Sequence, residues 1–374
     1  MYKIYQGIAD KEINYTLICS FNKYLYFMRI VYLYFLGIIC TPVFGQSSNV
    51  PYVFYNKDSI CIRNGSGENN CSRRTGEKIT LPITFADHPE WNFSVELKKK
   101  LTNEPSKFKA VETIFAVSDI EGEFEPFRNL LLANKVIDEN YNWTFGKGHL
   151  VICGDLFDRG KQVTEYLWLL YKLEQEAQAD GGYVHVVLGN HDIMNLSGDD
   201  RYVQPKYLDE ARMMNLEYKD MFTVNTELGR WLRTKNIIEK IGKTLFMHAG
   251  ISPRVNQLQW DITTINNTVR PYYDQAMREL PDTIRMFFDA GSPFWYRGYF
   301  KAPLATEAQI DSTCTLFGVK KIVVGHTIMD KVDTFFNKKV YGIDVNQHEG
   351  IYEGLLIQDE QYFRVDDKGN KTPL

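Results

Sequence analysis

Short polar motifs follow apolar runs at five places in this 374-residue chain, and this arrangement constrains the fold more than any other feature. Each apolar run has the length of a buried strand, and helical patterns separate the first three. Strands that alternate with helices form parallel sheets, whose strands end at a common edge where functional side chains gather. We therefore expect the five motifs to meet. They are DIEG at 119–122, GDLFDRG at 154–160, GNHD at 189–192, HAG at 248–250 and GHT at 325–327.

The alternation of strands and helices begins at Glu112 and predicts an α/β fold with βαβ units. Apolar positions recur at helical spacing in the predicted helices 123–134 and 163–178. The predicted strands of this part of the chain are 112–119, 149–155, 183–190, 244–250 and 320–327, and β segments at 331–336, 338–345 and 354–365 close the chain.

Three further regions complete the predicted organisation. Residues 46–110 alternate short apolar runs with turn clusters, which predicts a β-rich N-terminal extension. Residues 111–374 are predicted to form one catalytic domain, interrupted at 196–243 by a polar, helix-prone insertion. We expect this insertion to cap the site and to shape specificity, and its apolar residues Met213, Met214 and Trp231 equally suit the small core of such a cap.

Residues 1–45 have the features of a signal peptide region, with residues before Met28 as a possible over-called start. Arg29 precedes an apolar run at 30–45 that is shorter than the ~20 residues of a membrane span and ends on small residues. We expect cleavage before Gln46, a periplasmic or secreted protein, and no stable membrane insertion afterwards. An uncleaved segment would instead anchor the chain to the membrane.

Composition narrows the classes of partner and compartment. Hydrophobic residues make up 44% of the chain, enough for a large core, and the net charge of −4 provides no broad basic field for nucleic acid. Cys61 and Cys71 flank a turn-rich stretch, and two interpretations stay open: a hairpin disulfide in an oxidising compartment, or two unpaired thiols. Cys153 lies in an apolar run and is expected to be a buried small hydrophobe.

The residue types in the five motifs indicate a metal centre. Carboxylate and amide oxygens together with imidazole nitrogens suit Mn, Fe or Zn divalent ions. Taken alone, each motif has a structural explanation, since Asp155 could cap a helix and a single histidine could be a core residue. Five such motifs in this order make the structural explanation untenable for the set.

From about Thr113 to Asp344 the chain resembles the calcineurin-like metallophosphoesterases. It is most similar to the branch with phosphoprotein phosphatases, Shewanella-like phosphatases and diadenosine tetraphosphatases, because FWYRG at 294–298 matches that branch and GHT replaces the superfamily's GHxH. The resemblance implies a four-layer α/β/β/α sandwich that binds two divalent ions. One ion would be held by Asp119, Glu121 and Asp155, and the other by Asp155, Asn190, His248 and His326, with Asp155 bridging.

The resemblance also implies a mechanism in which a hydroxide between the two metals attacks phosphorus in line. His191, held by Asp158, would protonate the leaving oxygen, and Arg159 and Arg297 would clamp the phosphate. Asp158 and Arg159 could alternatively form a structural ion pair, and Arg297 could stack on its aromatic neighbours. The other four histidines match no ligand position and are predicted to be structural or surface residues. They are His88, His149, His185 and His348.

Glu121 departs from the family, which has histidine at this position of its Asp-x-His motif. Three interpretations remain: Glu121 is a carboxylate ligand, it misses the metal and water fills its place, or the site is inactive. As a ligand it would add negative charge, favour Mn²⁺ over Zn²⁺ and raise the pKa of the bridging water. On this interpretation, we expect Glu121→His to move the basic side of the activity profile to lower pH.

The sequence therefore predicts a dinuclear metal-dependent phosphatase for phosphomonoesters, including those of phosphoproteins. Two alternatives stay open at this point. One is a hydrolase of nucleotides or dinucleoside polyphosphates, and the other is a binding module with a vestigial site.

Overall fold

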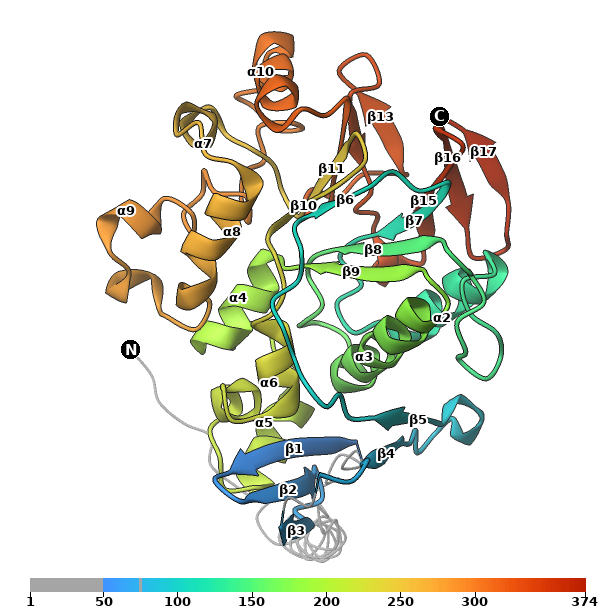
Figure 1. Ribbon diagram of the computed structural model, residues 1–374, viewed down its shortest axis with the longest axis vertical. Coiled ribbons are helices and arrows are strands. Elements are labelled where there is room, and N and C mark those ends of the chain that lie inside the picture. The colour runs from blue at the N-terminus through green and yellow to red at the C-terminus, as the bar shows by residue number, and fades with distance from the viewer. Residues whose placement is uncertain (1–49, 74–75) are drawn as a thin grey trace, which may run out of the picture. The chain divides into compact units, whose positions relative to one another are not determined.

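The computed structural model describes residues 50–73 and 76–374, so the predicted signal region lies outside the described residues. Figure 1 shows how the described elements are arranged. Within this part of the chain, no helix combines the length and the apolar character that crossing a membrane requires.

Two six-stranded sheets form the centre of the fold. The first has the order β17-β16-β15-β7-β8-β9, in which β7, β8 and β9 are parallel. Its strands are β7 (Thr113–Val117), β8 (His149–Cys153), β9 (Tyr183–Val187), β15 (Glu353–Gln358), β16 (Gln361–Asp366) and β17 (Lys371–Pro373). The prediction of a parallel βαβ arrangement is confirmed for β7, β8 and β9.

The second sheet has the order β13-β14-β12-β11-β10-β6, and its neighbouring strands β11, β12 and β14 are parallel. Its strands are β6 (Lys107–Phe108), β10 (Ile238–Ile241), β11 (Thr244–Met247), β12 (Lys321–Val324), β13 (Asp333–Phe335) and β14 (Val340–Gly342). The strands predicted around residues 244 and 320 are thus β11 and β12, next to each other in this sheet.

Successive side chains of β7 and β8 point alternately into two hydrophobic cores. Ile114 and Val151 pack with Phe246 and Val323 of the second sheet, which places this core between the sheets. Their neighbours in sequence, including Phe115, point to the other face and pack with the helices. Because side chains alternate across a strand, both faces of the first sheet are buried.

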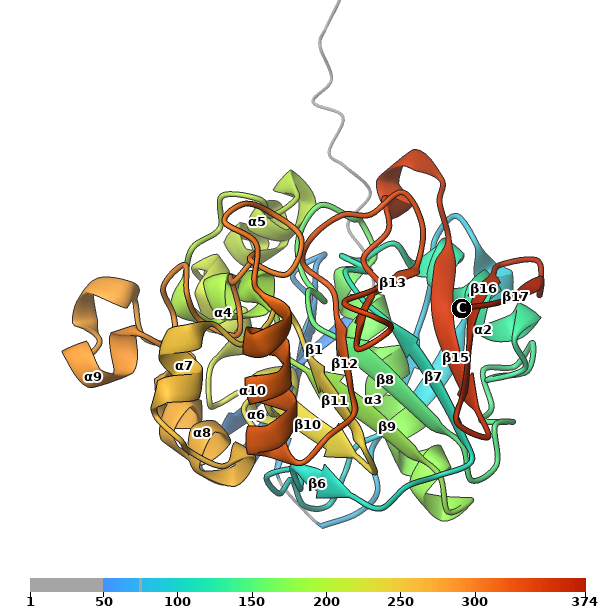
Figure 2. The same ribbon diagram turned by 90° about the horizontal axis from the view of Figure 1, so that it is seen from above.

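Helices cover the outer faces, so the four-layer α/β/β/α sandwich is confirmed. In Figure 2, α2 and α3 lie on the side of the first sheet, and α7, α8 and α10 on the side of the second. The helices outside the insertion are α2 (Phe124–Ala133), α3 (Val163–Ala179), α7 (Pro253–Gln257), α8 (Ile262–Val269), α9 (Asp282–Arg285) and α10 (Glu307–Phe317). Short 3-10 turns are η1 (Pro89–Trp91), η3 (Arg270–Tyr272), η4 (Met277–Glu279) and η5 (Gln347–Glu349).

The N-terminal part is rich in β structure, as predicted, and packs on α3. It contains an antiparallel sheet of β1 (Pro51–Asn56), β2 (Ser59–Asn64) and β3 (Asn69–Arg73), and a pair of β4 (Thr80–Ile83) and β5 (Phe93–Glu96). A Cys61–Cys71 disulfide joins β2 and β3 where these residues face each other, which resolves the choice between disulfide and free thiols. The hydroxyl group of Tyr52 lies 3.0 Å from Thr164 Oγ1, and the Trp168 indole donates to the Pro51 carbonyl at 3.0 Å.

The predicted helical insertion 196–243 is helical in part. It begins within α4 (Asn190–Ser197) and contains α5 (Pro205–Met213), η2 (Tyr218–Phe222) and α6 (Glu227–Leu232). Its last residues form β10, which was expected to be helical. Hydrogen bonding to β11 overrides the local pattern there, since β10 pairs antiparallel with that strand. Trp231 and Met214 are buried as the cap-core interpretation requires, whereas Met213 is exposed.

Candidate metal and phosphate site

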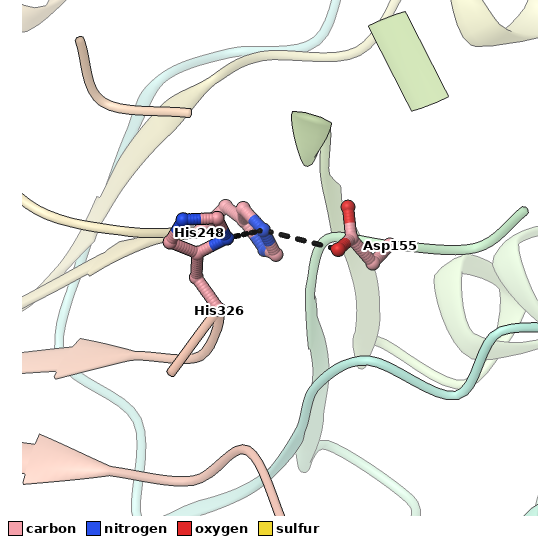
Figure 3. Close-up of side chains that lie close together, drawn as sticks. All are labelled: Asp155, His248 and His326. Atoms are coloured by element: carbon pink, nitrogen blue, oxygen red, sulfur yellow. Dashed lines mark hydrogen bonds and ion pairs between the residues drawn. The ribbon is translucent and has the colours of Figure 1, made fainter. Parts of the chain in front are cut away.

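The five motifs meet, as the sequence predicts, but they come from the strand ends of two sheets and not of one. Asp119 follows β7 and Asp155 follows β8, while Asn190 opens α4 directly after β9. His248 follows β11 and His326 follows β12, so the two sheets contribute to a common site. Figure 3 shows His248 and His326 approaching Asp155 from the opposite sheet.

The backbone at this edge is held in an uncommon conformation. Left-handed φ angles in residues other than glycine cost about 1 to 3 kcal/mol each and concentrate at functional sites. Six of the predicted site residues have them: Asp119 (54°), Glu121 (47°), Asp155 (54°), Asp158 (77°), Arg159 (52°) and His326 (65°). Interactions in the surrounding structure therefore stabilise an unfavourable backbone conformation that directs these side chains into the site.

Two glycines let the motifs approach one another closely. A Cβ atom on Gly189 would overlap Asp155 Oδ1, and a Cβ atom on Gly325 would overlap both Ser118 Oγ and Asp119 Oδ2. The glycines of GNHD and GHT are therefore required by the close approach of neighbouring loops.

Backbone carbonyl groups fix the orientation of both histidines. His248 Nδ1 lies 2.8 Å from the Cys153 carbonyl, and His326 Nε2 lies 3.2 Å from the Trp295 carbonyl. With each of these nitrogens donating, the other ring nitrogen, once deprotonated, is the one that can bind a metal. These two nitrogens, His248 Nε2 and His326 Nδ1, face each other at 3.1 Å.

Asn190 and Asp155 complete this cluster of donor atoms. Asn190 Oδ1 lies 2.9 Å from His248 Nε2 and 2.8 Å from His326 Nδ1, while Asp155 Oδ2 lies 3.3 Å from His248 Nε2. Lone pairs on these atoms that face one another would repel. A cation among them, or a 180° rotation of the Asn190 amide, would remove this repulsion. Two oxygens and two imidazole nitrogens suit a divalent ion of the Mn, Fe or Zn type. The residues thus fit the metal that the sequence predicts.

Burial disfavours a charged His248, but Asp155 and Asp119 outweigh it and raise the pKa of this ring to about 10, so a metal ion at Nε2 would displace a proton. Burial opposes the charge of Asp155, but His248 and then His191 outweigh it and hold the pKa of this carboxyl below its usual range. Burial and the neighbouring His248 lower the pKa of His326 to about 2. An ionised carboxylate beside a neutral imidazole is the ligand state that metal binding needs.

A second group of potential ligand atoms shares Asp155. Glu121, Asp155 and His191 each offer an atom within 4.8 Å of the others, and Glu121 Oε1 lies 3.9 Å from His191 Nε2. Asp119 lies next to these residues but turns its Oδ2 atom to the backbone N–H of His326 at 3.0 Å. Burial raises the pKa of Asp119 to about 6. The structure thus brings the six predicted ligands together, with Asp155 common to both groups.

His191 forms a pair with Asp158. The Nδ1 atom lies 2.5 Å from Asp158 Oδ2, and Asn195 donates to Asp158 Oδ1 at 2.9 Å. Burial disfavours the charged ring, but the carboxylates of Asp155 and Asp158 outweigh it and raise the pKa of His191. The Nε2 atom faces the metal cluster and carries the second proton when the ring is charged.

The two predicted phosphate-binding arginines reach the site differently. Arg159 forms an ion pair with Glu121 and also lies 3.4 Å from His191 Nε2. Arg297 donates to the His326 carbonyl at 2.6 Å and lines an adjoining cavity of about 970 Å³. Arg159 therefore offsets the charge of Glu121, which weakens the expectation that Glu121 adds uncompensated negative charge.

Two residues with a role at the site were missed by sequence reasoning. Asp192 accepts hydrogen bonds from the backbone N–H groups of Gly189 at 2.6 Å and Leu156 at 2.8 Å, so it links GNHD to GDLFDRG. Its position within the GNHD motif could have indicated this role. His348, predicted to be a structural or surface residue, is exposed but also contacts a predicted ligand. Its Nε2 atom lies 2.7 Å from Glu121 Oε2, a contact across 227 positions that no local pattern indicates.

The other three histidines are structural or superficial, as predicted. His185 is buried between His149 at 2.8 Å and Glu239 at 2.6 Å, and burial lowers the pKa of both histidines to about 3. His88 pairs with Glu90 at 3.0 Å on the exposed surface.

Comparison with known proteins agrees with this geometry. The profile of calcineurin-like phosphoesterases matches residues 112–330. Shewanella-like protein phosphatase 2 of Arabidopsis thaliana is 26% identical over 73% of this chain and 81% of its own. A symmetrical bis(5'-nucleosyl)-tetraphosphatase of Xylella fastidiosa is 30% identical, but over only 38% of this chain and 44% of its own.

Solved structures extend the comparison to the fold. A cold-active protein tyrosine phosphatase from a psychrophilic Shewanella species superposes with a TM-score of 0.78, at 33% identity over 87% of this chain and 98% of that chain. A yeast serine/threonine phosphatase similar to human PP5 shares the fold alone, with a TM-score of 0.50 and 15% identity over 68% of this chain and 77% of that chain.

Proposed function

This chain belongs to the calcineurin-like phosphoesterase family, and from that premise we propose that it is a dinuclear metal-dependent phosphatase that hydrolyses phosphomonoesters of proteins. One observation carries the proposal: the donor cluster around Asp155 lies beside the His191–Asp158 pair. A metal site and a proton donor are thus adjacent, which is what cleavage of an unactivated phosphate ester requires.

Two divalent ions, when bound, would supply an activated water and neutralise charge on the phosphate. The ligands that we assign are Asp119, Glu121, Asp155, Asn190, His248 and His326. The mixture of oxygen and nitrogen donors, with oxygen in the majority, favours Mn²⁺.

The remaining site residues act on the phosphate and the leaving group. His191, oriented by Asp158 through the 2.5 Å contact, donates its Nε2 proton to the departing oxygen. Arg297 orients the phosphate from the rim of the cavity, since a planar guanidinium matches pairs of phosphate oxygens. Arg159 holds Glu121 and contributes its remaining N–H groups to the phosphate.

The cavity beside the site supports a substrate larger than a free phosphate group. Its volume of about 970 Å³ is at the upper end of the range for sites that enclose a whole small molecule. Apolar residues line it, including Ile193, Met194 and Trp295, together with Arg201 and Arg278. Such walls suit an aromatic phosphoresidue with flanking peptide. The similar Shewanella protein is described as a protein tyrosine phosphatase, which favours phosphotyrosine as the first substrate to test.

A panel of substrates tests this function. We expect Mn²⁺-loaded protein to release inorganic phosphate from phosphotyrosyl and phosphoseryl peptides and from small aryl phosphates. The similarity to a bis(5'-nucleosyl)-tetraphosphatase supports one alternative, hydrolysis of dinucleoside polyphosphates. Release of nucleotides from diadenosine tetraphosphate without phosphate release from peptides would favour that alternative. Stoichiometric metal without turnover of any ester would favour a binding module.

We also propose that residues 1–45 are removed as a leader. The mature protein, with an extension at 46–110 and a catalytic domain at 111–374, then acts outside the cytoplasm. The Cys61–Cys71 disulfide supports an oxidising compartment such as the periplasm or the exterior. N-terminal sequencing of protein recovered from the periplasm or medium tests the proposal, and we expect the chain to begin at Gln46.

A further inference from the structure

The turn at η5 (Gln347–Glu349) is attached to the loop that carries Asp119 and Glu121. Gln347 Nε2 donates to the Ser118 carbonyl at 2.9 Å, and the next residue, His348, contacts Glu121 Oε2 at 2.7 Å. The segment after β14 therefore supports the first motif directly, although it lies far from this motif in sequence.

The ring of His348 is fixed from both sides. Its Nε2 atom contacts Glu121, and its Nδ1 atom lies 3.1 Å from Glu123 Oε1, just before α2. His348 thus engages Oε2 of the Glu121 carboxylate, while Oε1 forms the ion pair with Arg159 and lies 3.9 Å from His191 Nε2. A glutamate side chain has more rotatable bonds than a histidine and gains more from such an anchor.

We propose that His348 and Glu121 together replace the histidine that this family has at position 121. Glu121 would supply the ligand atom Oε1 in exchange for its contact with Arg159, and the N–H group of His348 holds Oε2 so that Oε1 stays directed at the site. His348 is thus a positioning residue for metal binding, comparable to the outer partners that orient metal ligands elsewhere. This inference rests on the proposed dinuclear function and concerns the ion nearest Glu121.

Metal binding, measured apart from turnover, tests the proposal. Mn²⁺ is titrated into metal-stripped protein by calorimetry, and electron paramagnetic resonance reports whether the two ions form a coupled pair. His348→Ala should weaken binding of one of the two ions by about 10- to 100-fold, as loss of an outer partner usually does. His348→Gln, which keeps an N–H donor, should restore most of that affinity. His88→Ala removes a surface histidine from a comparable His–Glu pair and serves as the matched control.

The decisive comparison is the effect of His348→Ala in a protein that also carries Glu121→His. With histidine at position 121, His348→Ala should change Mn²⁺ affinity by no more than about twofold. The effects of two substitutions that do not interact usually add to within about this margin. Three results would overturn the inference: wild-type affinity in His348→Ala, an equal loss in both backgrounds, or no recovery in His348→Gln. The proposed function is judged separately, by phosphate release from 4-nitrophenyl phosphate by the wild-type protein with Mn²⁺.

Discussion

Replacing Asp158 by asparagine isolates the proton-donating role of His191. Asn195 donates to Asp158 Oδ1, so the oxygen of an introduced asparagine would stay there and its NH₂ group would face His191 Nδ1. The 2.5 Å contact would then join two donors, and His191 would lose the partner that stabilises its charged form. A hydrogen bond to a charged group contributes about 1.5 to 3 kcal/mol, which corresponds to roughly 10- to 150-fold in rate.

The loss should depend on the leaving group. We expect kcat for phenyl phosphate or phosphoserine peptide to fall by this factor in Asp158→Asn. With 4-nitrophenyl phosphate, whose leaving group needs no proton, kcat should change by about twofold or less. Mn²⁺ content is measured in parallel to confirm that the metals remain. Equal losses on activated and unactivated esters, with metal retained, would refute the assignment of His191 as the acid.

Three further predictions concern stability, packing and substrate binding. Burial raises the pKa of Glu165 from 4.5 to about 7. Its contribution to stability is therefore present below pH 4.5 and is lost as the pH rises toward 7. At 1.36 kcal/mol per pH unit, the free energy of unfolding should fall by about 3 kcal/mol across this range. Glu165→Gln should remove this slope in denaturant titrations, and parallel curves for both proteins would contradict it. Gly325→Ala should lower Mn²⁺ content and destabilise by about 1 to 3 kcal/mol, because its Cβ would displace Asp119; full metal content would show that the loop adapts. Arg297→Lys should raise KM for phosphotyrosine by about tenfold through loss of a charge-assisted hydrogen bond, and an unchanged KM would remove Arg297 from the binding site.

The parts of this protein that sequence reasoning found are those with a local signature. Strands such as β8 and helices such as α3 have their own apolar period, and the polar residues after the strands mark the site edge. Convergence of Asp119, Asp155 and Asn190 followed from topology, because they come after the parallel strands β7, β8 and β9, which end at one edge of the first sheet. The approach of His248 to Asp155 depends on the packing of the second sheet against the first.

The rest depends on contacts between distant parts of the chain. His348 looks like any exposed loop histidine, and only the folded η5 turn brings it to Glu121. The four residues of β10 are too few to display a strand period, and their conformation is set by pairing with β11. The ion pair of Arg159 with Glu121 likewise exists because two loops from different strands meet.

Metal content of the protein with and without His248 tests the central claim most directly. Wild-type protein dialysed against Mn²⁺ should retain two equivalents per chain by elemental analysis and hydrolyse aryl phosphate. His248→Ala should lose at least one equivalent together with turnover, while His149→Ala, a buried histidine outside the cluster, should keep both ions. Two equivalents and undiminished turnover in His248→Ala would contradict the account.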